Sequence, residues 1–264
     1  MIIAEIGWNF LGDMSLAKKM IDDAKDSSCK FIKFQLWDPK NLKAGDWDTD
    51  GRREIYDKAF LNEEKYEELF NYCTEKNLVC FASVFNEAGI KILSKFSKKY
   101  IKIPSLEAYD LNMVKKSLDN FENVLISTGA MKHDELKKIE DFKSCENLTV
   151  LHCVSSYPLK YENTNFSKFF YLKDKFTKVG YSGHCIGIDD AIFAISNGAV
   201  AVEKHFTSDN NLPGRDNKFA ILKSDLKKLC DYQKKVSDMT INHGLDLQKS
   251  EIDAYKNYRG RWKC

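Results

Sequence analysis

The chain has 264 residues, with 41 lysines and arginines against 39 aspartates and glutamates, which is a formal net charge of +2. A charge this close to neutral supplies no large basic field of the kind that holds nucleic acid by counterion release. No apolar run reaches the roughly 18 residues of a membrane-spanning helix, so we expect no membrane segment. The N-terminus lacks the basic and apolar regions of a signal peptide, so we expect a cytoplasmic protein.

The eight cysteines are scattered along the sequence and form no C-x-x-C pair. Cys80 and Cys153 each stand inside an apolar run. Structural zinc sites need clustered thiolates, which this spacing does not provide. The pattern therefore predicts buried, reduced thiols rather than disulfide bonds or a zinc site.

Short apolar, β-branched runs alternate with longer amphipathic segments in chain order. We expect strands at 2–6, 31–35, 78–83, 100–103, 123–127, 148–154, 179–182 and 199–205. A long loop carrying Trp37 and Trp47 follows the second strand, and Asn62 caps the helix after it. Further helices are expected at 16–24, 87–95, 111–118, 134–142, 166–173, 189–196 and 224–235.

Eight strand–helix units in 264 residues correspond to roughly 30 residues each, the length of one βαβ step. The strands are continuous apolar runs, as in parallel sheets that are buried on both faces. We therefore predict an α/β fold, a (β/α)₈ TIM barrel that forms a single domain over residues 1–264. A doubly wound sheet is the alternative, but no glycine-rich dinucleotide motif follows the first strand.

Two lysines stand inside expected strands, because Lys33 and Lys102 are each flanked by apolar residues. In such barrels the active site lies at the carboxyl ends of the strands. A buried ammonium group requires an anionic partner. The structural alternative is an ion pair with Glu5 or Glu107, and the functional interpretation is a small, highly charged anionic substrate.

Hydroxyl groups follow several strands at the same end of the expected barrel. The tripeptide Ser127-Thr128-Gly129 lies between a strand and a helix, where its glycine lets backbone amides approach a phosphate. The other strand-end serines are Ser83, Ser105, Ser155 and Ser182. Together with the two lysines, they favour a ligand that carries both phosphate and carboxylate.

Two histidines end neighbouring strands, namely His184 and His205. A pair of imidazoles at this spacing suits a divalent metal with open positions for water and substrate. His152 lies inside an apolar strand, where a hydrogen-bonded core histidine is as good an explanation as a functional one. His133 and His243 are expected at the surface.

An ordered set of short motifs runs along nearly the whole chain. The motifs are AEIG with Asn9, KFQ at 33–35, KIPSLE at 102–107, STG at 127–129, LHCVSSYP at 151–158, GYSGH at 180–184, EKHFT at 203–207 and PGRD at 213–216. In identity and order they resemble the sialic acid synthase (N-acetylneuraminate synthase) family.

The resemblance implies a cytoplasmic, homo-oligomeric enzyme that condenses phosphoenolpyruvate (PEP) with an N-acetylhexosamine-type aldose. The products would be a nonulosonic 2-keto acid and phosphate. Manganese or magnesium would be bound by His184 and His205. The resemblance places around PEP the side chains of Lys33, Ser83, Lys102, Ser105, Ser127 and Ser182.

On the sugar side, the resemblance implies contacts from Gln35, Tyr157 and Asp216, with Ser155 at a substrate position where the family usually has asparagine. Glu5 and Glu107 would be acid/base or water-positioning groups, and their order stays open.

Several positions depart from the family pattern. Phe10 replaces a usual histidine, Gly183 replaces the aspartate before the metal histidine, and Ser83-Val84 replaces a Thr-Pro pair. We also expect no C-terminal antifreeze-like domain, which in most members lends an arginine to the partner's sugar site. The acceptor therefore stays open among sugars that lead to legionaminic or pseudaminic acid and smaller aldoses. A Schiff-base aldolase and a non-catalytic binder of an anion or a partner protein are the alternatives.

Overall fold

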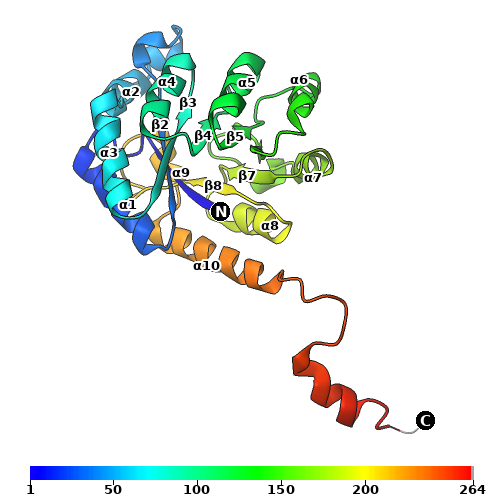
Figure 1. Ribbon diagram of the computed structural model, residues 1–264. Coiled ribbons are helices and arrows are strands. Elements are labelled where there is room, and N and C mark those ends of the chain that lie inside the picture. The colour runs from blue at the N-terminus through cyan, green and yellow to red at the C-terminus, as the bar shows by residue number, and fades with distance from the viewer. Residues whose placement is uncertain (263–264) are drawn as a thin grey trace.

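Eight parallel strands close into a barrel in the computed structural model, which describes residues 1–262 (Figure 1). Each strand pairs with its neighbours in chain order, and β8 pairs with β1. The strands are β1 Ile2–Gly7, β2 Phe31–Leu36, β3 Val79–Val84, β4 Tyr100–Ile103, β5 Asn123–Ser127, β6 Leu148–Cys153, β7 Val179–Gly183 and β8 Val202–His205. The predicted (β/α)₈ barrel is confirmed, and the doubly wound sheet is excluded.

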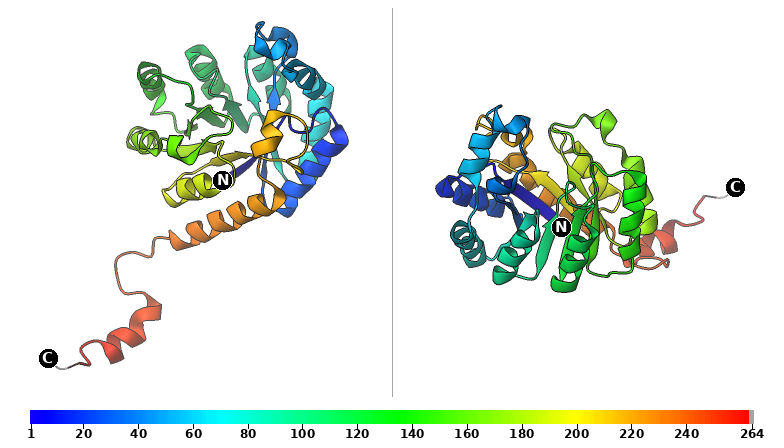
Figure 2. Two further views of the ribbon diagram at one scale, coloured as in Figure 1. Left: turned by 180° about the vertical axis from the view of Figure 1, so that it is seen from behind. Right: turned by 90° about the horizontal axis from the view of Figure 1, so that it is seen from above.

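Helices surround the barrel and cover the outer faces of the strands (Figures 1 and 2). They are α1 Met14–Asp26, α3 Glu63–Glu75, α4 Glu87–Phe96, α5 Leu111–Asn120, α6 His133–Ile139, α7 Phe166–Lys175, α8 Asp189–Ser196 and α10 Lys223–Met239. Two shorter helices, α2 Arg52–Ala59 and α9 Arg215–Phe219, belong to the segments that follow β2 and β8. The Asn62 side chain accepts a hydrogen bond from the Lys65 backbone amide, which confirms the predicted cap of α3.

Three sequence expectations need correction. The long loop after β2 contains helix α2, which buries only Ala59 and whose exposed charges form i,i+4 pairs, so its apolar periodicity is weak. The short helix α9 was not expected. Strand β8 begins at Val202 instead of residue 199, because the chain turns at Gly198, where φ is 84°, and bends at Val200.

The barrel interior has an apolar floor and a polar upper part. Ile3, Phe81, Leu125, Leu151 and Ala201 form a buried cluster inside the barrel. The larger apolar cluster lies between the strands and the helices. Two residues beyond four of these positions the inward side chain is charged or carries a hydroxyl, namely Glu5, Ser83, Ser127 and Glu203, which places a polar site directly above an apolar floor.

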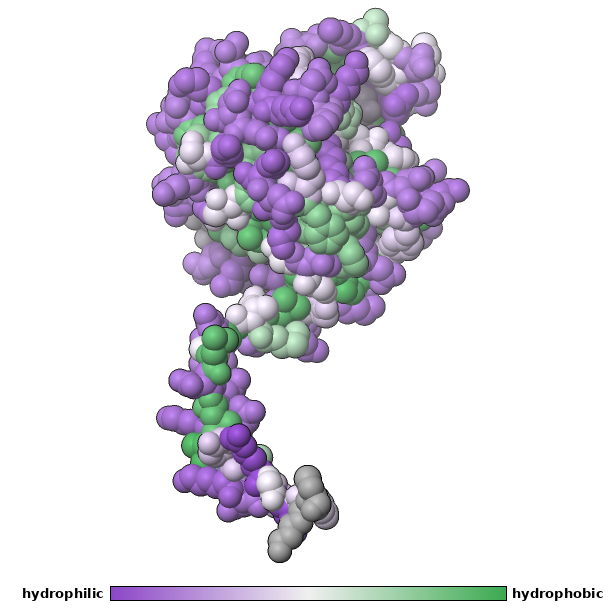
Figure 3. All heavy atoms as spheres, turned by 90° about the vertical axis from the view of Figure 1, so that its right-hand side faces the viewer, coloured by the Kyte–Doolittle hydropathy of each residue, from purple (hydrophilic) through white to green (hydrophobic). Residues whose placement is uncertain are grey.

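Residues beyond α10 extend away from the barrel (Figures 1 and 2). Residues 240–262 are exposed and contain short helical turns at Lys249–Glu251 and Ala254–Tyr258. Hydrophobic residues are visible on the surface of this segment (Figure 3). Leu245 and Trp262 are among its exposed large apolar side chains.

The cysteines of residues 1–262 are all free thiols, as the sequence predicted, whereas Cys264 lies outside the described residues. Over that same part of the chain, no helix combines the length and the apolar character needed to cross a membrane.

Candidate active site

Strand register brings the predicted site residues together at the carboxyl end of the barrel. Glu5 pairs in register with Lys33 on one side and with His205 on the other. Ser182 pairs with Glu203 in the same way. Since side chains alternate along a strand, these residues all face the barrel interior.

Lys33 lies at the centre of a buried polar network. Its Nζ is 2.6 Å from Glu5 Oε2, donates to Ser83 Oγ at 2.6 Å and lies 3.6 Å from Glu203 Oε2. Gln35 Nε2 donates to Glu5 Oε1 at 2.7 Å. The Lys–Glu pair considered from the sequence therefore exists with Glu5, inside the predicted site.

Lys102 forms the second buried ion pair, with Nζ at 3.2 Å from both carboxylate oxygens of Glu203. Ser182 Oγ donates to Glu203 Oε1 at 3.0 Å. Burial alone would raise the pKa of Glu203, but the ammonium groups of Lys102 and Lys33 outweigh it and lower that pKa to about 2. Sequence reasoning assigned Glu203 no role, although its position two residues before His205 places both side chains on the same face.

Burial favours the neutral forms of Glu5 and Lys102, so it shifts their pKa values in opposite directions. Burial raises the pKa of Glu5, and the nearby Lys33 ammonium opposes it only in part. Burial lowers the pKa of Lys102, and Glu203 only partly offsets this. Each group is thereby brought closer to the protonation range in which it can exchange a proton.

Hydroxyl groups from β4, β5 and β6 gather beside these charges. Ser105 Oγ accepts a hydrogen bond from the Gly129 backbone amide at 3.0 Å. A Cβ at position 129 would collide with the hydroxyl groups of Ser155 and Ser105, so glycine is required there. The Oγ atoms of Ser127 and Ser155 are buried and have no hydrogen-bond partner among residues 1–262. Buried hydroxyls without partners point to a polar ligand.

The two imidazoles lie together at the same mouth, with the ring centroids of His184 and His205 5.5 Å apart. His184 Nδ1 lies 2.9 Å from the Val154 carbonyl oxygen and 4.0 Å from Cys153 Sγ. Burial lowers the pKa of His184, but this thiol and carbonyl outweigh burial and raise it. Both neighbours favour a proton on Nδ1, which leaves Nε2 as the nitrogen able to bind a metal.

His205 is held mainly in its neutral form. Burial lowers the pKa of His205 to about 4, against the opposing effect of Asp216. Its Nδ1 lies 3.7 Å from Asp216 Oδ2, and neutral imidazole is the form that binds metals. In the described part of the chain no group of three or more His, Cys, Asp or Glu side chains is arranged to hold a metal. The two imidazoles would thus form an open site whose remaining ligands come from water or substrate.

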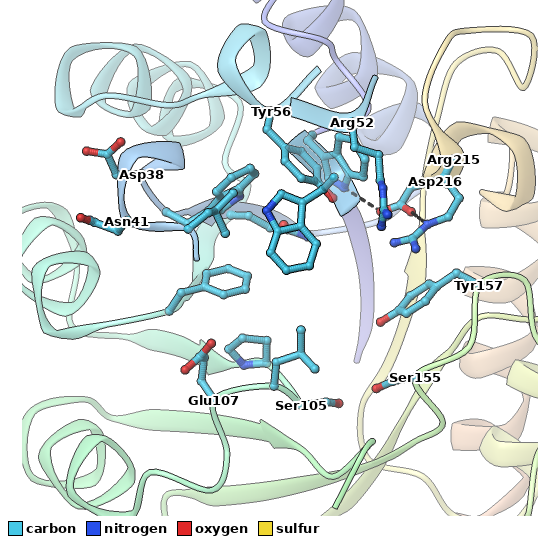
Figure 4. A pocket seen from close by; sticks show the side chains of 18 of the residues that line it. Asp38, Asn41, Arg52, Tyr56, Ser105, Glu107, Ser155, Tyr157, Arg215 and Asp216 are labelled. Carbon is cyan, nitrogen blue, oxygen red and sulfur yellow. Dashed lines mark hydrogen bonds and ion pairs between the residues drawn. The ribbon is translucent and has the colours of Figure 1, made fainter. Parts of the chain in front are cut away.

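A pocket of about 580 Å³ opens above the charged network (Figure 4). Its aromatic lining consists of Trp8, Trp37, Trp47, Tyr56 and Phe85. Its polar lining includes Gln35, Arg52, Ser105, Glu107, Ser155, Tyr157, His205, Arg215 and Asp216. Much of the aromatic wall comes from the segment between β2 and α3, to which sequence reasoning assigned no site residue. The tryptophan content of this segment is the sequence signal that could have indicated a binding surface.

Asp216 is anchored between the pocket and the imidazoles. It accepts a hydrogen bond from Trp8 Nε1 at 2.7 Å and one from Arg215 Nε at 3.2 Å. The Arg215 guanidinium carbon lies 4.6 Å from the centre of the Tyr157 ring. Figure 4 shows these groups on one side of the pocket, opposite Asp38 and Asn41.

The predicted site residue Glu107 and the histidine His152, for which a core position was the alternative, lie away from the lysines. Glu107 is half-buried at the pocket, and neither Lys33 nor Lys102 pairs with it. Burial and the nearby Asp110 raise the pKa of Glu107. His152 is buried in the core, and its Nε2 lies 2.7 Å from the Thr164 carbonyl oxygen.

Comparison with known proteins identifies this combination of barrel and site. The model of the NeuB family matches residues 20–243. The chain belongs to the NeuB family. It is 32% identical to an N,N'-diacetyllegionaminic acid synthase of Campylobacter jejuni, with 97% of this chain and 81% of that protein covered. A pseudaminic acid synthase from the same species is also 32% identical, over 95% of this chain and 78% of its own length.

A solved relative has the same fold throughout. The N-acetylneuraminic acid synthetase of Leptospira borgpetersenii, crystallised with citrate, superimposes with a TM-score of 0.84 at 29% identity. The alignment covers 99% of this chain and 92% of that one. The sialic acid synthase family expected from the motifs is thus confirmed, and this NeuB-family chain is an enzyme of the synthase type.

Proposed function

We propose that the protein catalyses a metal-dependent condensation of PEP with an N-acetylhexosamine-type aldose, giving a nonulosonic 2-keto acid and phosphate. The observation that carries this proposal is that a charged site and an aromatic pocket adjoin each other at the same end of the barrel. A buried network of two lysines and several hydroxyls opens directly into a pocket with aromatic walls. The first suits a small anion, and the second suits a sugar.

The lower part of the site would bind PEP through Lys33, Lys102 and the free Ser127 hydroxyl. Charge-assisted hydrogen bonds of this kind are the strong ones. Lys33 and Lys102 are, however, already balanced by Glu5 and Glu203. PEP carries about three negative charges near neutral pH, so the site requires additional positive charge.

His184 and His205 would hold the divalent ion that supplies this charge, manganese or magnesium, with water or substrate completing the coordination. When bound there, the ion acts as a Lewis acid that polarises the carbonyl oxygen of the open-chain sugar. Tyr157, whose ring centroid lies 4.2 Å from that of His184, would contact the sugar beside it.

The reaction forms one carbon–carbon bond and breaks one carbon–oxygen bond. The C2–C3 π electrons of PEP attack the aldehyde carbon, and the aldehyde oxygen takes up a proton. A water oxygen then adds to C2 and releases one proton, which leaves a hydroxyl group on C2. The C2–O bond to phosphate breaks as the keto group forms, and the hydroxyl proton leaves with the phosphate. Glu5 is the better placed base for that water proton, because it lies buried beside Lys33 and its pKa is raised. Glu107, at the pocket wall, would contact the acceptor.

The pocket fits an acceptor with apolar faces and several hydroxyls. Aromatic rings stack on such faces, while Gln35, Ser155 and Asp216 offer hydrogen-bonding partners. The named relatives make legionaminic, pseudaminic and N-acetylneuraminic acids, so the acceptor is to be sought among acetamido sugars. The Schiff-base alternative fits less well, because the ammonium groups of Lys33 and Lys102 are both engaged by carboxylates. The cytoplasmic location and the homo-oligomer expected from the resemblance stay predictions.

The test incubates the protein with PEP, Mn²⁺ and a panel of aldoses, with phosphate release and product mass as the readouts. We expect release that requires both an acetamido sugar and the metal, and that EDTA abolishes. PEP binding without phosphate release from any acceptor would support the non-catalytic alternative. Borohydride trapping of a keto substrate, without a need for metal, would support the Schiff-base alternative.

A further inference from the structure

A buried ion pair lies on the outer face of β8, behind the two imidazoles and outside the reaction chemistry described above. Lys204 Nζ is 3.1 Å from both carboxylate oxygens of Asp190 and donates to the Cys185 carbonyl oxygen at 2.7 Å. Tyr181 donates its hydroxyl proton to Asp190 Oδ2 at 3.0 Å. The side chains of Lys204 and Asp190 are only 1% and 0% exposed.

This pair connects the two segments that carry the imidazoles. Lys204 immediately precedes His205 on β8, while Cys185 immediately follows His184 in the loop after β7. Strand register pairs Gly183 with Lys204. One ammonium group therefore ties the backbone on the far side of His184 to the strand that carries His205.

The ion pair leaves no room for a side chain at Gly183. A Cβ built at Gly183 would lie 2.5 Å from Asp190 Oδ2, 2.5 Å from Tyr181 Cε1 and 3.2 Å from Lys204 Cδ. The Asp190 carboxylate thus occupies the space beside the residue that precedes His184. Asp190 also accepts a hydrogen bond from the Ala191 amide at 2.9 Å, which fixes it to the start of α8.

Stability alone does not explain a buried pair of this kind, because apolar side chains of similar volume are often equally or more stabilising. Its hydrogen bonds instead set the relative position of two backbone segments. We propose that Lys204 and Asp190 are positioning residues, which set the spacing and orientation of His184 and His205 for a divalent ion. The inference rests on the metal assignment in the proposed function.

The test uses the double variant Lys204→Met/Asp190→Leu, which removes both charges and leaves no unpaired buried ion. Mn²⁺ affinity is measured by calorimetry without substrates, and folding by urea denaturation. We expect the double variant to fold, with a lowered denaturation midpoint because the Tyr181 hydroxyl and the Cys185 carbonyl lose their partners. We expect its Mn²⁺ affinity to be weakened by about 10- to 100-fold, as for changes to groups that orient metal ligands. Lys204→Arg, which keeps the charge but moves the donor, is expected to fold and to bind Mn²⁺ more weakly. Lys204→Arg replaces the double variant in the Mn²⁺ measurement if the double variant does not fold.

Lys115→Met/Asp119→Leu is the matched control, because it removes an exposed ion pair on α5 and is expected to leave Mn²⁺ affinity unchanged. A second readout is the ¹⁵N signal of the His184 ring, which reports the hydrogen bond of Nδ1 to Val154 without any metal. We expect this signal to shift in the Lys204/Asp190 variants. If the wild type binds Mn²⁺, an unchanged Mn²⁺ affinity in the Lys204/Asp190 variants would overturn the proposal. If the wild type binds no Mn²⁺, the metal assignment fails, and the His184 ring signal then decides whether the pair positions this imidazole. An unchanged ring signal in the variants would in that case overturn the proposal.

Discussion

The ion pair between Lys102 and Glu203 allows a quantitative test of the buried network. Replacing Lys102 with methionine keeps most of the volume and removes the ammonium group that contributes most to lowering the pKa of Glu203, from an ordinary 4.5 to about 2. At 1.36 kcal/mol for each pKa unit, this lowering corresponds to about 3 kcal/mol. Lys33 remains 3.6 Å from Glu203 and retains part of the effect. Burial also lowers the pKa of Lys102, so removing its ammonium relieves a cost that offsets part of the loss. We therefore expect Lys102→Met to lower the free energy of unfolding by about 2 kcal/mol at pH 7.

The expected pH dependence follows from the sign of the Glu203 pKa change. A carboxyl whose pKa is lower in the folded protein stabilises the fold above its unfolded pKa, and this contribution is lost as the pH falls through the folded value. For Glu203 the loss runs from pH 4.5 toward about 2. In Lys102→Met the pKa of Glu203 is higher than in the wild type, because one of the ammonium groups that oppose the effect of burial is gone. Lowering the pH therefore removes less stability from the variant than from the wild type. The difference between variant and wild type should narrow below pH 4.5.

The assay is urea denaturation of both proteins at several pH values between neutral and the acid limit of the folded wild type. Lys115→Met serves as the control, because the Lys115–Asp119 pair is exposed and should leave stability unchanged. A difference that stays constant with pH, or no difference at neutral pH, would refute the coupling of Lys102 to Glu203.

Three further changes test other parts of the molecule. His205→Ala should abolish Mn²⁺ binding in equilibrium dialysis and leave the denaturation midpoint nearly unchanged; retained binding would contradict the metal assignment. Gly183→Ala should destabilise the fold by about 1–3 kcal/mol through overpacking against Asp190, and a neutral result in urea denaturation would be inconsistent with the 2.5 Å approach. Burial lowers the pKa of His152 from 6.5 to about 4, so wild type should lose stability as the pH falls through this range. The loss should be smaller in His152→Leu, and an equal loss in both proteins would count against that pKa.

The barrel was predictable because its local signals agree. Buried parallel strands are continuous apolar runs, and amphipathic helices follow them at a regular interval. Helix α2 (Arg52–Ala59) escaped prediction because it buries only Ala59, so apolar periodicity carried no signal there. The aromatic wall beside it was missed for a related reason, since Trp37 and Trp47 belong to an irregular segment whose path depends on what it packs against.

By itself, the sequence determined the fold class, the family and the end of the barrel at which the site lies. These follow from periodicity and from motif order, both of which are local along the chain. Only the tertiary structure decided the partners: Lys33 with Glu5, Lys102 with Glu203, and Lys204 with Asp190. Residues such as Lys102 and Glu203, which are 101 positions apart, meet because strand register and barrel closure bring them together. Register depends on every strand at once, so no single segment of the sequence contains it.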